Sequence, residues 1–329
     1  MRPDPNDPVL SWPPAPGERS REVWYSLVSP RDGSAALWSR YTLLSTGRGR
    51  REGRLWVAYT DRESPEDSTF VTESFAPEDV RPAGDPFQLT VGDAVLTSAG
   101  ATGEVGDVSW DLAYEPDTYA FTPLRSETLT DVLARTVDTG RHWSRNQSVS
   151  MSGEVTVGDR TLALEDAPGH QGHTVSAAPP ESWSWVQCND FAEEDAAVLE
   201  ALRLGRALTI CLRIDGEIYP LNRLKYVVPY GPSANRTDHD EPGHWRFRGA
   251  GEGIELQATV EADPDHWHRV AYLLPDDSLR YNAHCSLSRL TLTYRRDGED
   301  ARTITSDVAR AEWVDVDPPV GGPYRPSWD

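Results

Sequence analysis

Short apolar runs separated by turn residues follow one another along almost the whole chain, and this spacing is the strongest constraint on its fold. Runs such as EVWYSLVS, AALWSRYTLL and RLWVAYTD are rich in β-branched and aromatic residues. They are typical of antiparallel strands. Gly92-Asp93, Gly158-Asp159 and Asp215-Gly216 stand between such runs, where these pairs predict tight hairpin turns. Helix signals are few, and the clearest predicts one short helix over residues 126–135, capped by Ser126.

The two halves of the chain resemble each other in their order of runs. Trp24 and Trp183 lie in similar aromatic runs 159 positions apart, and Phe87 and Trp245 lie 158 positions apart. A nearly constant offset predicts two copies of one antiparallel meander. Each copy is expected to close into a β-barrel, because closure removes exposed strand edges. The expected organisation is an extended segment over 1–20, a first barrel over 21–178 and a second over 179–329.

The composition is strongly acidic and limits the class of partner. Asp and Glu number 53 against 32 Lys and Arg, which gives a formal net charge of −21. Such a surface repels phosphate backbones, so nucleic acid is not an expected partner. Lys225 is the only lysine. This favours either a salt-adapted cytoplasm or a genome rich in G and C.

Other sequence features point to a cytoplasmic protein. Cys188, Cys211 and Cys285 form no CxxC pair, and three distant cysteines do not make a disulfide framework. The first 20 residues contain no apolar stretch of the kind found in a signal peptide. No apolar run approaches the roughly 20 residues that span a bilayer. We therefore expect no membrane span and a cytoplasmic location.

Two alternatives for the chemistry have weak support. His170 and His173 are spaced H-x-x-H, and a second polar cluster occupies residues 238–244, but no complete set of zinc ligands is visible. We predict that the protein folds without metal and uses no cofactor, and a metal-dependent hydrolase is only an outsider. Cys188 lies in a strand beside Trp185, where a small buried thiol is more typical than a nucleophile. Nucleotide-binding and nucleophile-elbow motifs are absent.

Aromatic residues in predicted strands are the remaining signal. Most of them are expected to fill the cores, but some can line an apolar cavity, since small barrels hold one hydrophobic ligand. Trp183 and Trp185 are two residues apart on a strand and therefore share a face. Carboxylates beside aromatic walls can have raised pKa values and act as acids, which makes Glu73 and Asp111 candidates. The bland alternative for both is an ordinary surface carboxylate.

Several segments of the sequence resemble those of a known family. The segments EVWYSLVS, TGEVGDVSWDLAYEP, PGHQGH, SWSWVQCNDF and YNAHCSLSRL together resemble the AttH and carotenoid 1,2-hydratase group. Members read roughly W-x-W-x-H-C-N-x-F where this chain has Trp183 to Phe191. Gln187 replaces the histidine before the cysteine, and residues 177–180 hold no second histidine. The resemblance covers about residues 24–295.

The resemblance implies two lipocalin-like domains in tandem and a hydrophobic ligand. Members include isoprenoid hydratases and cyclases and proteins with no known reaction. The leading hypothesis is that a hydrophobic small molecule, an isoprenoid for example, binds in a barrel or inter-domain pocket. Cofactor-free cyclisation, hydration or isomerisation would follow there. The alternative is a non-catalytic carrier, which the missing histidines favour. The candidate residues are Glu73, Asp111 and His173 for catalysis, and Trp24, Tyr25, Trp110, Trp183, Trp185 and Asn189 for ligand binding.

Overall fold

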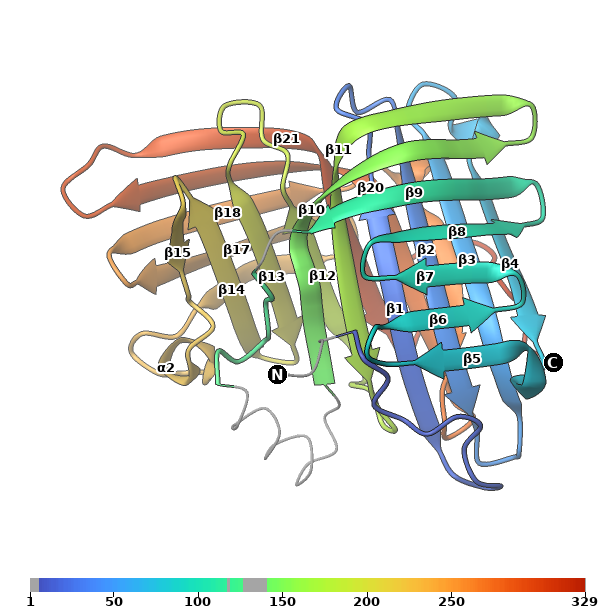
Figure 1. The fold of residues 1–329 in the computed structure, drawn as a ribbon. Coiled ribbons are helices and arrows are strands. Elements are labelled where there is room, and N and C mark those ends of the chain that lie inside the picture. Colours follow the sequence, from blue (N-terminus) through green and yellow to red (C-terminus); the bar gives the residue numbers. More distant parts are fainter. Residues whose placement is uncertain (1–5, 117–118, 127–140, 329) are drawn as a thin grey trace. The chain divides into compact units, whose positions relative to one another are not determined.

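The computed structural model describes residues 6–116, 119–126 and 141–328 and divides the chain into two compact units. Unit 1 comprises residues 1–120, 133–179 and 273–279, and unit 2 comprises 121–132, 180–272 and 280–329. Each unit is built on its own antiparallel sheet (Figure 1). The all-β class expected from the sequence is confirmed. The boundary expected near residue 178 between independently folding domains stays a prediction.

Unit 1 contains an 11-stranded sheet with the order β4-β3-β2-β1-β11-β10-β9-β8-β7-β6-β5. The strands are β1 (Ser20–Val28), β2 (Ala35–Ser45), β3 (Arg51–Asp61), β4 (Thr69–Phe75), β5 (Val80–Ala83), β6 (Gln88–Val91), β7 (Ala94–Thr97), β8 (Gly100–Val105), β9 (Val108–Pro116), β10 (Arg141–Val157) and β11 (Arg160–Val175). The sheet curls until β3 and β4 lie across from β8, so it nearly closes a barrel. Two short 3-10 turns, Pro65–Asp67 and Pro77–Asp79, flank β4.

Unit 2 contains a 10-stranded sheet with the order β15-β14-β13-β12-β21-β20-β18-β17-β16, and β19 pairs with β20 beside this path. The strands are β12 (Trp183–Cys188), β13 (Val198–Leu204), β14 (Ala207–Ile214), β15 (Glu217–Tyr219), β16 (Arg236–Glu241), β17 (His244–Gly251), β18 (Ile254–Glu261), β19 (His268–Leu273), β20 (Leu279–Arg296) and β21 (Arg302–Asp315). The helical elements described here are α2 (Leu224–Val227) and the 3-10 turn Pro264–His266. The helix expected over 126–135 lies almost wholly outside the described residues.

All three predicted hairpin turns are confirmed. Gly92 and Gly158 follow the last residues of β6 and β10 and have φ angles of 59° and 56°. Asp215 and Gly216 join β14 to β15, and both have positive φ angles, 51° and 77°. Two positive φ values in succession are what a two-residue hairpin loop of type I′ requires.

The tandem repeat is visible in the strand order. In each unit the first strand pairs with the last, β1 with β11 and β12 with β21. Counting outward from this seam matches β8 of unit 1 with β17 of unit 2. The sequence match of Phe87 with Trp245 is therefore wrong, because Phe87 precedes β6 while Trp245 lies in β17. Unit 1 contains two extra short strands, β5 and β6, before the matching strands resume.

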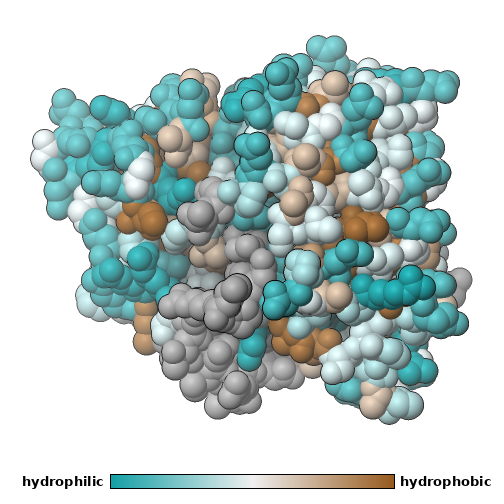
Figure 2. All heavy atoms as spheres, viewed as in Figure 1, coloured by the Kyte–Doolittle hydropathy of each residue, from teal (hydrophilic) through white to brown (hydrophobic). Residues whose placement is uncertain are grey.

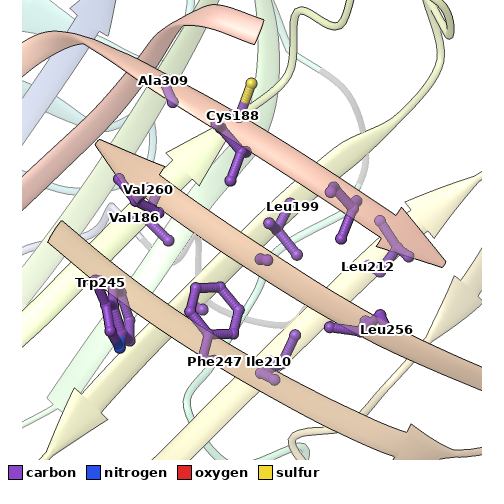
Figure 3. Packing of buried hydrophobic residues seen from close by; sticks show 14 of the residues in the cluster. Val186, Cys188, Leu199, Ile210, Leu212, Trp245, Phe247, Leu256, Val260 and Ala309 are labelled. Atoms are coloured by element: carbon purple, nitrogen blue, oxygen red, sulfur yellow. The ribbon is translucent and has the colours of Figure 1, made fainter. Parts of the chain in front are cut away.

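Each unit encloses its own hydrophobic core. Trp24 and Trp110 are buried in the core of unit 1. In unit 2, Trp245 and Phe247 pack with ring centroids 4.6 Å apart among aliphatic side chains (Figure 3). Cys188, Cys211 and Cys285 are all buried and unbridged. These tryptophans confirm that part of the aromatic signal in the sequence reports core packing.

The exterior is mostly hydrophilic, as expected from a composition rich in charged residues. On the face drawn in Figure 2, hydrophilic and neutral residues predominate, and hydrophobic residues form small separated patches. Among the residues that the structure describes, no helix has the length and apolarity needed to cross a membrane.

Candidate functional site

One face of unit 2 collects polar and aromatic side chains that do not belong to its core. Along β12 the side chains alternate, and Val186 and Cys188 point into the hydrophobic core. Trp183, Trp185 and Gln187 therefore point to the opposite face of the sheet. We call this surface the Trp185 face. Its members are Trp183, Trp185, Gln187, Asn189, Glu200, Asn282, His284, Arg310 and Glu312.

Strand register places charged residues beside β12 on this face. Gln187 is paired with Glu200 of β13 on one side and with Arg310 of β21 on the other. One rung along, Trp185 is paired with Glu312, which in turn is opposite His284 of β20. Two carboxylates, a guanidinium and an imidazole from β13, β21 and β20 thus lie on one face together with Trp185 and Gln187 of β12.

Both tryptophans of β12 are held by carboxylates. Trp183 Nε1 donates a hydrogen bond to Glu312 Oε1 at 2.7 Å. Trp185 Nε1 donates to Glu200 Oε1 at 3.0 Å. Glu200 has no solvent exposure, and Trp185 retains 4%. The indole rings are therefore fixed in orientation, which a surface for an apolar ligand requires.

A histidine and a carboxylate lie together on the same face. His284 Nδ1 is 3.9 Å from Glu312 Oε2, and Asn282 Nδ2 donates to that same oxygen at 2.9 Å. Asn282 Nδ2 also lies 2.7 Å from the hydroxyl of Tyr272, and His284 Nε2 shares a hydrogen bond of 2.8 Å with Ser286 Oγ. The His284 side chain is buried, with 1% exposed, and the Glu312 side chain is partly open to solvent, with 19% exposed.

Arg310 is a fully buried cation in this surface. Its Nη1 donates to Gln187 Oε1 at 3.2 Å and to Asn189 Oδ1 at 2.6 Å. Burial lowers the pKa of the Arg310 guanidinium, which nevertheless stays charged because arginine has so high an ordinary value. Burial raises the pKa of the neighbouring Cys188 thiol to about 11. A thiol with this pKa is protonated at neutral pH and is not a nucleophile.

His268 lies close enough to this surface to interact electrostatically with His284. Burial is the main cause that lowers the pKa of His268 to about 3, and the neighbouring His284, His266 and Arg269 lower it further. His268 is therefore neutral at physiological pH.

The candidate residues from the first half of the chain lie in unit 1. His173 of β11 is paired with Trp24 of β1, and their rings stack with centroids 4.7 Å apart. His173 Nε2 lies 2.8 Å from Glu22 Oε1, and both side chains are completely buried. Trp143, on the neighbouring strand β10, also stacks on His173, with ring centroids 5.1 Å apart. We call these four residues the His173 cluster.

The N-terminal segment completes the His173 cluster. Backbone N–H groups of Val9 and Leu10 donate to the two carboxylate oxygens of Glu22 at 2.8 and 3.1 Å. Trp24 Nε1 donates to the carbonyl oxygen of Asn6 at 2.9 Å. The segment expected to be extended therefore lies against β1.

The remaining candidates are not brought together. Tyr25 faces away from Trp24 and packs over Gly172, where an added Cβ would lie 2.2 Å from the phenol ring. Trp110 is a core residue. Glu73 and Asp111 are exposed on β4 and β9. The sequence left open whether these two are acids beside aromatic walls or ordinary surface carboxylates, and strand alternation turns both toward solvent.

The H-x-x-H pair does not converge either. His170 and His173 are three residues apart on one strand, so they point to opposite faces. His170 packs near Tyr25 at 5.7 Å, whereas His173 lies among Trp24 and Trp143. The pair therefore cannot hold one metal ion. Among the described residues no group of three or more potential ligands is suitably placed for a metal.

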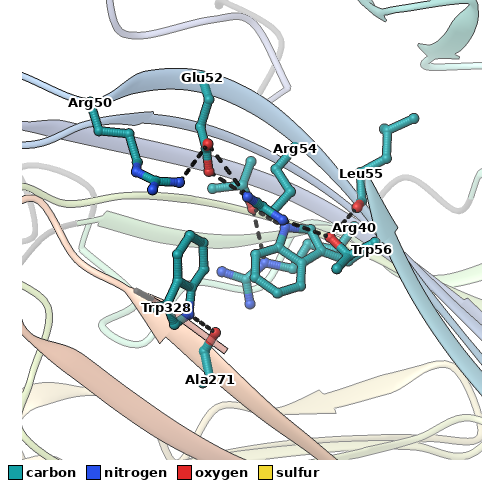
Figure 4. Close-up of polar contacts among 10 residues, drawn as sticks. Arg40, Arg50, Glu52, Arg54, Leu55, Trp56, Ala271 and Trp328 are labelled. Carbon is teal, nitrogen blue, oxygen red and sulfur yellow. Dashed lines mark hydrogen bonds and ion pairs between the residues drawn. The ribbon is translucent and has the colours of Figure 1, made fainter. Parts of the chain in front are cut away.

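A second cluster of cationic side chains lies on β2 and β3 of unit 1 and includes Arg50, which directly precedes β3. Trp56 has the guanidinium carbons of Arg40 and Arg54 at 5.7 and 5.5 Å from its ring centre. Arg54 and Arg50 both bind the Glu52 carboxylate, at 2.9 and 3.2 Å (Figure 4). Because an anionic partner is built into this cluster, its charges are partly compensated within unit 1.

The important residues that the sequence did not reveal are Glu22, Glu200, His284, Arg310 and Glu312. His284 stands in the quoted segment YNAHCSLSRL, and Arg310 and Glu312 alternate along ARAEW, so a polar face of each strand was visible. The sequence does not show which strands pair with β12 or in which register they pair.

The chain was compared with known proteins in sequence and in structure. No family model matches the sequence. Two uncharacterised proteins of Mycobacterium tuberculosis, from strains CDC 1551 / Oshkosh and H37Rv, are each 24% identical over 265 residues, which is 78% of this chain and 75% of each relative.

Two solved structures share the architecture along nearly the whole chain. An AttH candidate from Nitrosomonas europaea matches with a TM-score of 0.52 and 13% identity, over 96% of this chain and 99% of that one. Kievitone hydratase from Nectria haematococca matches with a TM-score of 0.55 and 13% identity, over 91% and 89%. The resemblance expected from the sequence is thus confirmed at the level of the fold.

Proposed function

We propose that this chain is a cofactor-independent hydratase, or the reverse dehydratase, acting on a hydrophobic small molecule at the Trp185 face. The observation that carries the proposal is the pair of buried His284 and partly exposed Glu312 beside two indoles that carboxylates hold in place. The fold shared with kievitone hydratase, a protein named for a hydration reaction, supports this class of chemistry.

The proposed reaction needs only groups of this face and water. A protonated Glu312 or His284 gives its proton to one carbon of an alkene, and the π electrons form the new C–H bond. The indole faces of Trp183 and Trp185 stabilise the resulting carbocation by about 2 kcal/mol each when water is excluded. A water oxygen then bonds to the cation, and its surplus proton returns to the Glu312–His284 pair. The sum is alkene plus water to alcohol.

The surroundings suit a ligand with little polar surface. Glu200, Asn282 and Arg310 have no solvent exposure, and His284 has 1%. In such shielded surroundings a charge interacts more strongly than in water, so one oriented carboxylate can both hold an indole and influence a cation. An isoprenoid with a tertiary allylic alcohol has the chemistry that this face would accept.

The test follows oxygen exchange in linalool, a tertiary allylic alcohol. Reversible dehydration in water enriched in oxygen-18 should move the label into the alcohol, as mass spectrometry of recovered linalool would show. Glu312→Gln and His284→Gln should each lower the exchange rate by about 100-fold, the usual size of an acid–base contribution. Glu261→Gln, which changes an exposed carboxylate of β18, should leave it unchanged.

A second variant separates the two histidine–carboxylate pairs. His173→Gln removes the imidazole of the His173 cluster and should leave label exchange at the wild-type rate if the enzyme remains folded. Loss of exchange in His173→Gln, with full exchange in His284→Gln, would contradict the assignment to the Trp185 face.

A carrier function is the second candidate, and Gln187 favours it. The family resemblance has a histidine at this position, whereas here the amide oxygen accepts a hydrogen bond from Arg310. A carrier should bind the neutral probe N-phenyl-1-naphthylamine saturably without any label exchange in linalool. Trp185→Ala should then weaken probe binding in a protein that still unfolds cooperatively.

A further inference from the structure

A stripe of basic side chains covers the outer surface of β16 and β17 in unit 2. In the run HWRFR, Trp245 and Phe247 enter the core, so the residues between and beside them point outward. We call the basic members of this outward set the basic stripe: Arg236, His239, His244, Arg246 and Arg248. The exposed carboxylates of Asp238 and Glu241 lie on β16 beside them. Three arginines gathered on two neighbouring strands stand out in a chain with a net charge of −21.

The strand register sets like charges against each other. Arg236 lies directly opposite Arg248, and His239 lies opposite Arg246. Like charges at directly opposite positions of an antiparallel pair destabilise it. Arg248 Nε has a carboxylate, Asp238 Oδ1, at 3.3 Å. Arg236 and Arg246 have no ion-pair partner among the described residues, so the repulsion is only partly compensated.

A groove of about 810 Å³ adjoins the stripe. Its charged lining residues are Arg236 of β16, Arg248 of β17, Glu255 of β18 and Arg295 of β20, all on neighbouring strands of one sheet. The Glu255 carboxylate binds Arg295 Nη2 at 2.8 Å. Tyr294 also borders the groove, but its side chain belongs to the hydrophobic core on the other face of β20, so it offers no donor to a ligand among the arginines. The lining therefore offers three guanidinium groups, of which Arg248 is paired with Asp238 and Arg295 with Glu255.

We propose that this groove binds the oxyanionic group, phosphate or carboxylate, of a small molecule. Guanidinium groups recognise both anions through paired N–H donors, and an anion between Arg236 and Arg248 would convert their repulsion into attraction. The remaining acidic surface repels extended polyanions, which restricts the ligand to a small molecule. The site is separate from the Trp185 face, because it uses β16, β17, β18 and β20 at positions outside that set.

The experiment measures binding of pyrophosphate and of citrate by calorimetry, with the ionic strength held constant by KCl. The full chain should bind at least one of them saturably, and which one it prefers tells phosphate from carboxylate recognition. The double variant Arg236→Gln/Arg248→Gln should lose about tenfold or more in affinity, since a charge-assisted hydrogen bond contributes at least that much. Arg289→Gln, an exposed arginine of the same sheet paired with Asp307, should bind as the wild type does.

Folding of the double variant is checked independently. Because it removes a repulsive pair, its melting temperature in KCl should equal or exceed that of the wild type. No saturable heat with either anion at millimolar concentration would overturn the proposal. Equal affinities in the wild type and in a folded double variant would overturn it as well.

Discussion

His268 illustrates how a single side chain can set the response of this fold to acid. Its pKa is about 3 in the folded protein, against an ordinary value of 6.5, and burial is the main cause. As the pH falls below 6.5, the unfolded chain binds a proton that the folded chain does not accept until about pH 3. The folded state therefore loses stability over this interval.

The expected loss can be isolated by comparing two proteins. Between pH 7 and pH 5 the wild type should lose about 2 kcal/mol of unfolding free energy through His268 alone. His268→Gln, which cannot titrate, should show a correspondingly smaller fall over the same interval. Urea unfolding at both pH values measures the difference. A wild type and variant that lose stability in parallel would show that His268 is protonated as easily in the folded state as in the unfolded one.

For single residues, the sequence predicts which face of a strand a side chain occupies but not which side chains of other strands lie beside it. Period-two alternation correctly put Trp183 and Trp185 on one face, because alternation is local and follows from the strand itself. The same argument did not reach His284 or Glu312, whose positions depend on which strands become neighbours. Trp24 lies in the core of unit 1, whereas Trp183 faces away from the core of unit 2, although both occupy the first strand of a unit.

Among the elements, the segment over residues 6–10 acts as a partner for β1. It supplies two N–H donors to Glu22 and a carbonyl acceptor to Trp24, and both side chains are fully buried. Deletion of residues 1–12 should therefore leave a carboxylate and an indole N–H without these partners. We expect a loss of about 2–4 kcal/mol of unfolding free energy, since each unsatisfied buried group costs about 1–3 kcal/mol.

A double-mutant cycle tests that cause directly. In the full chain Glu22→Gln should be destabilising, because it weakens the hydrogen bonds from Val9, Leu10 and His173. In the deleted chain the same substitution should cost less, or should stabilise, because the carboxylate is then partly unpaired. Chemical denaturation of the four proteins gives the coupling energy. Additive effects would mean that the segment stabilises unit 1 without acting through Glu22.

At the scale of the whole molecule, charge is the dominant property. Carboxylates outnumber basic groups by 21, and their mutual repulsion opposes the compact state. Raising KCl from about 0.1 M to 2 M shortens the Debye length from about 10 Å to under 3 Å. The melting temperature should therefore rise over this range, as calorimetry can show. A flat or falling melting temperature would argue against adaptation to a salt-rich cell.

Local sequence signals specified much of this architecture, namely the hairpins, the antiparallel class and the repetition in tandem. They could not specify that residues 121–132 group with the second unit or residues 273–279 with the first. Such groupings depend on contacts between segments far apart in the chain. Gly47, for example, donates its N–H to the carbonyl oxygen of Pro275, and no local pattern encodes that bond.

The pairing of β1 with β11 has a consequence for synthesis of the protein. Glu22 is opposite Val175, so the first strand meets its neighbour only after roughly 150 further residues have left the ribosome. At 5–20 residues per second, that interval is about 10–30 s. During this time β1, with Trp24 and Leu27, is paired only with β2 along one edge, and its other edge waits for β11. The nascent chain is therefore a natural client for a chaperone that binds apolar strands, and the need ends when the last strand closes the sheet.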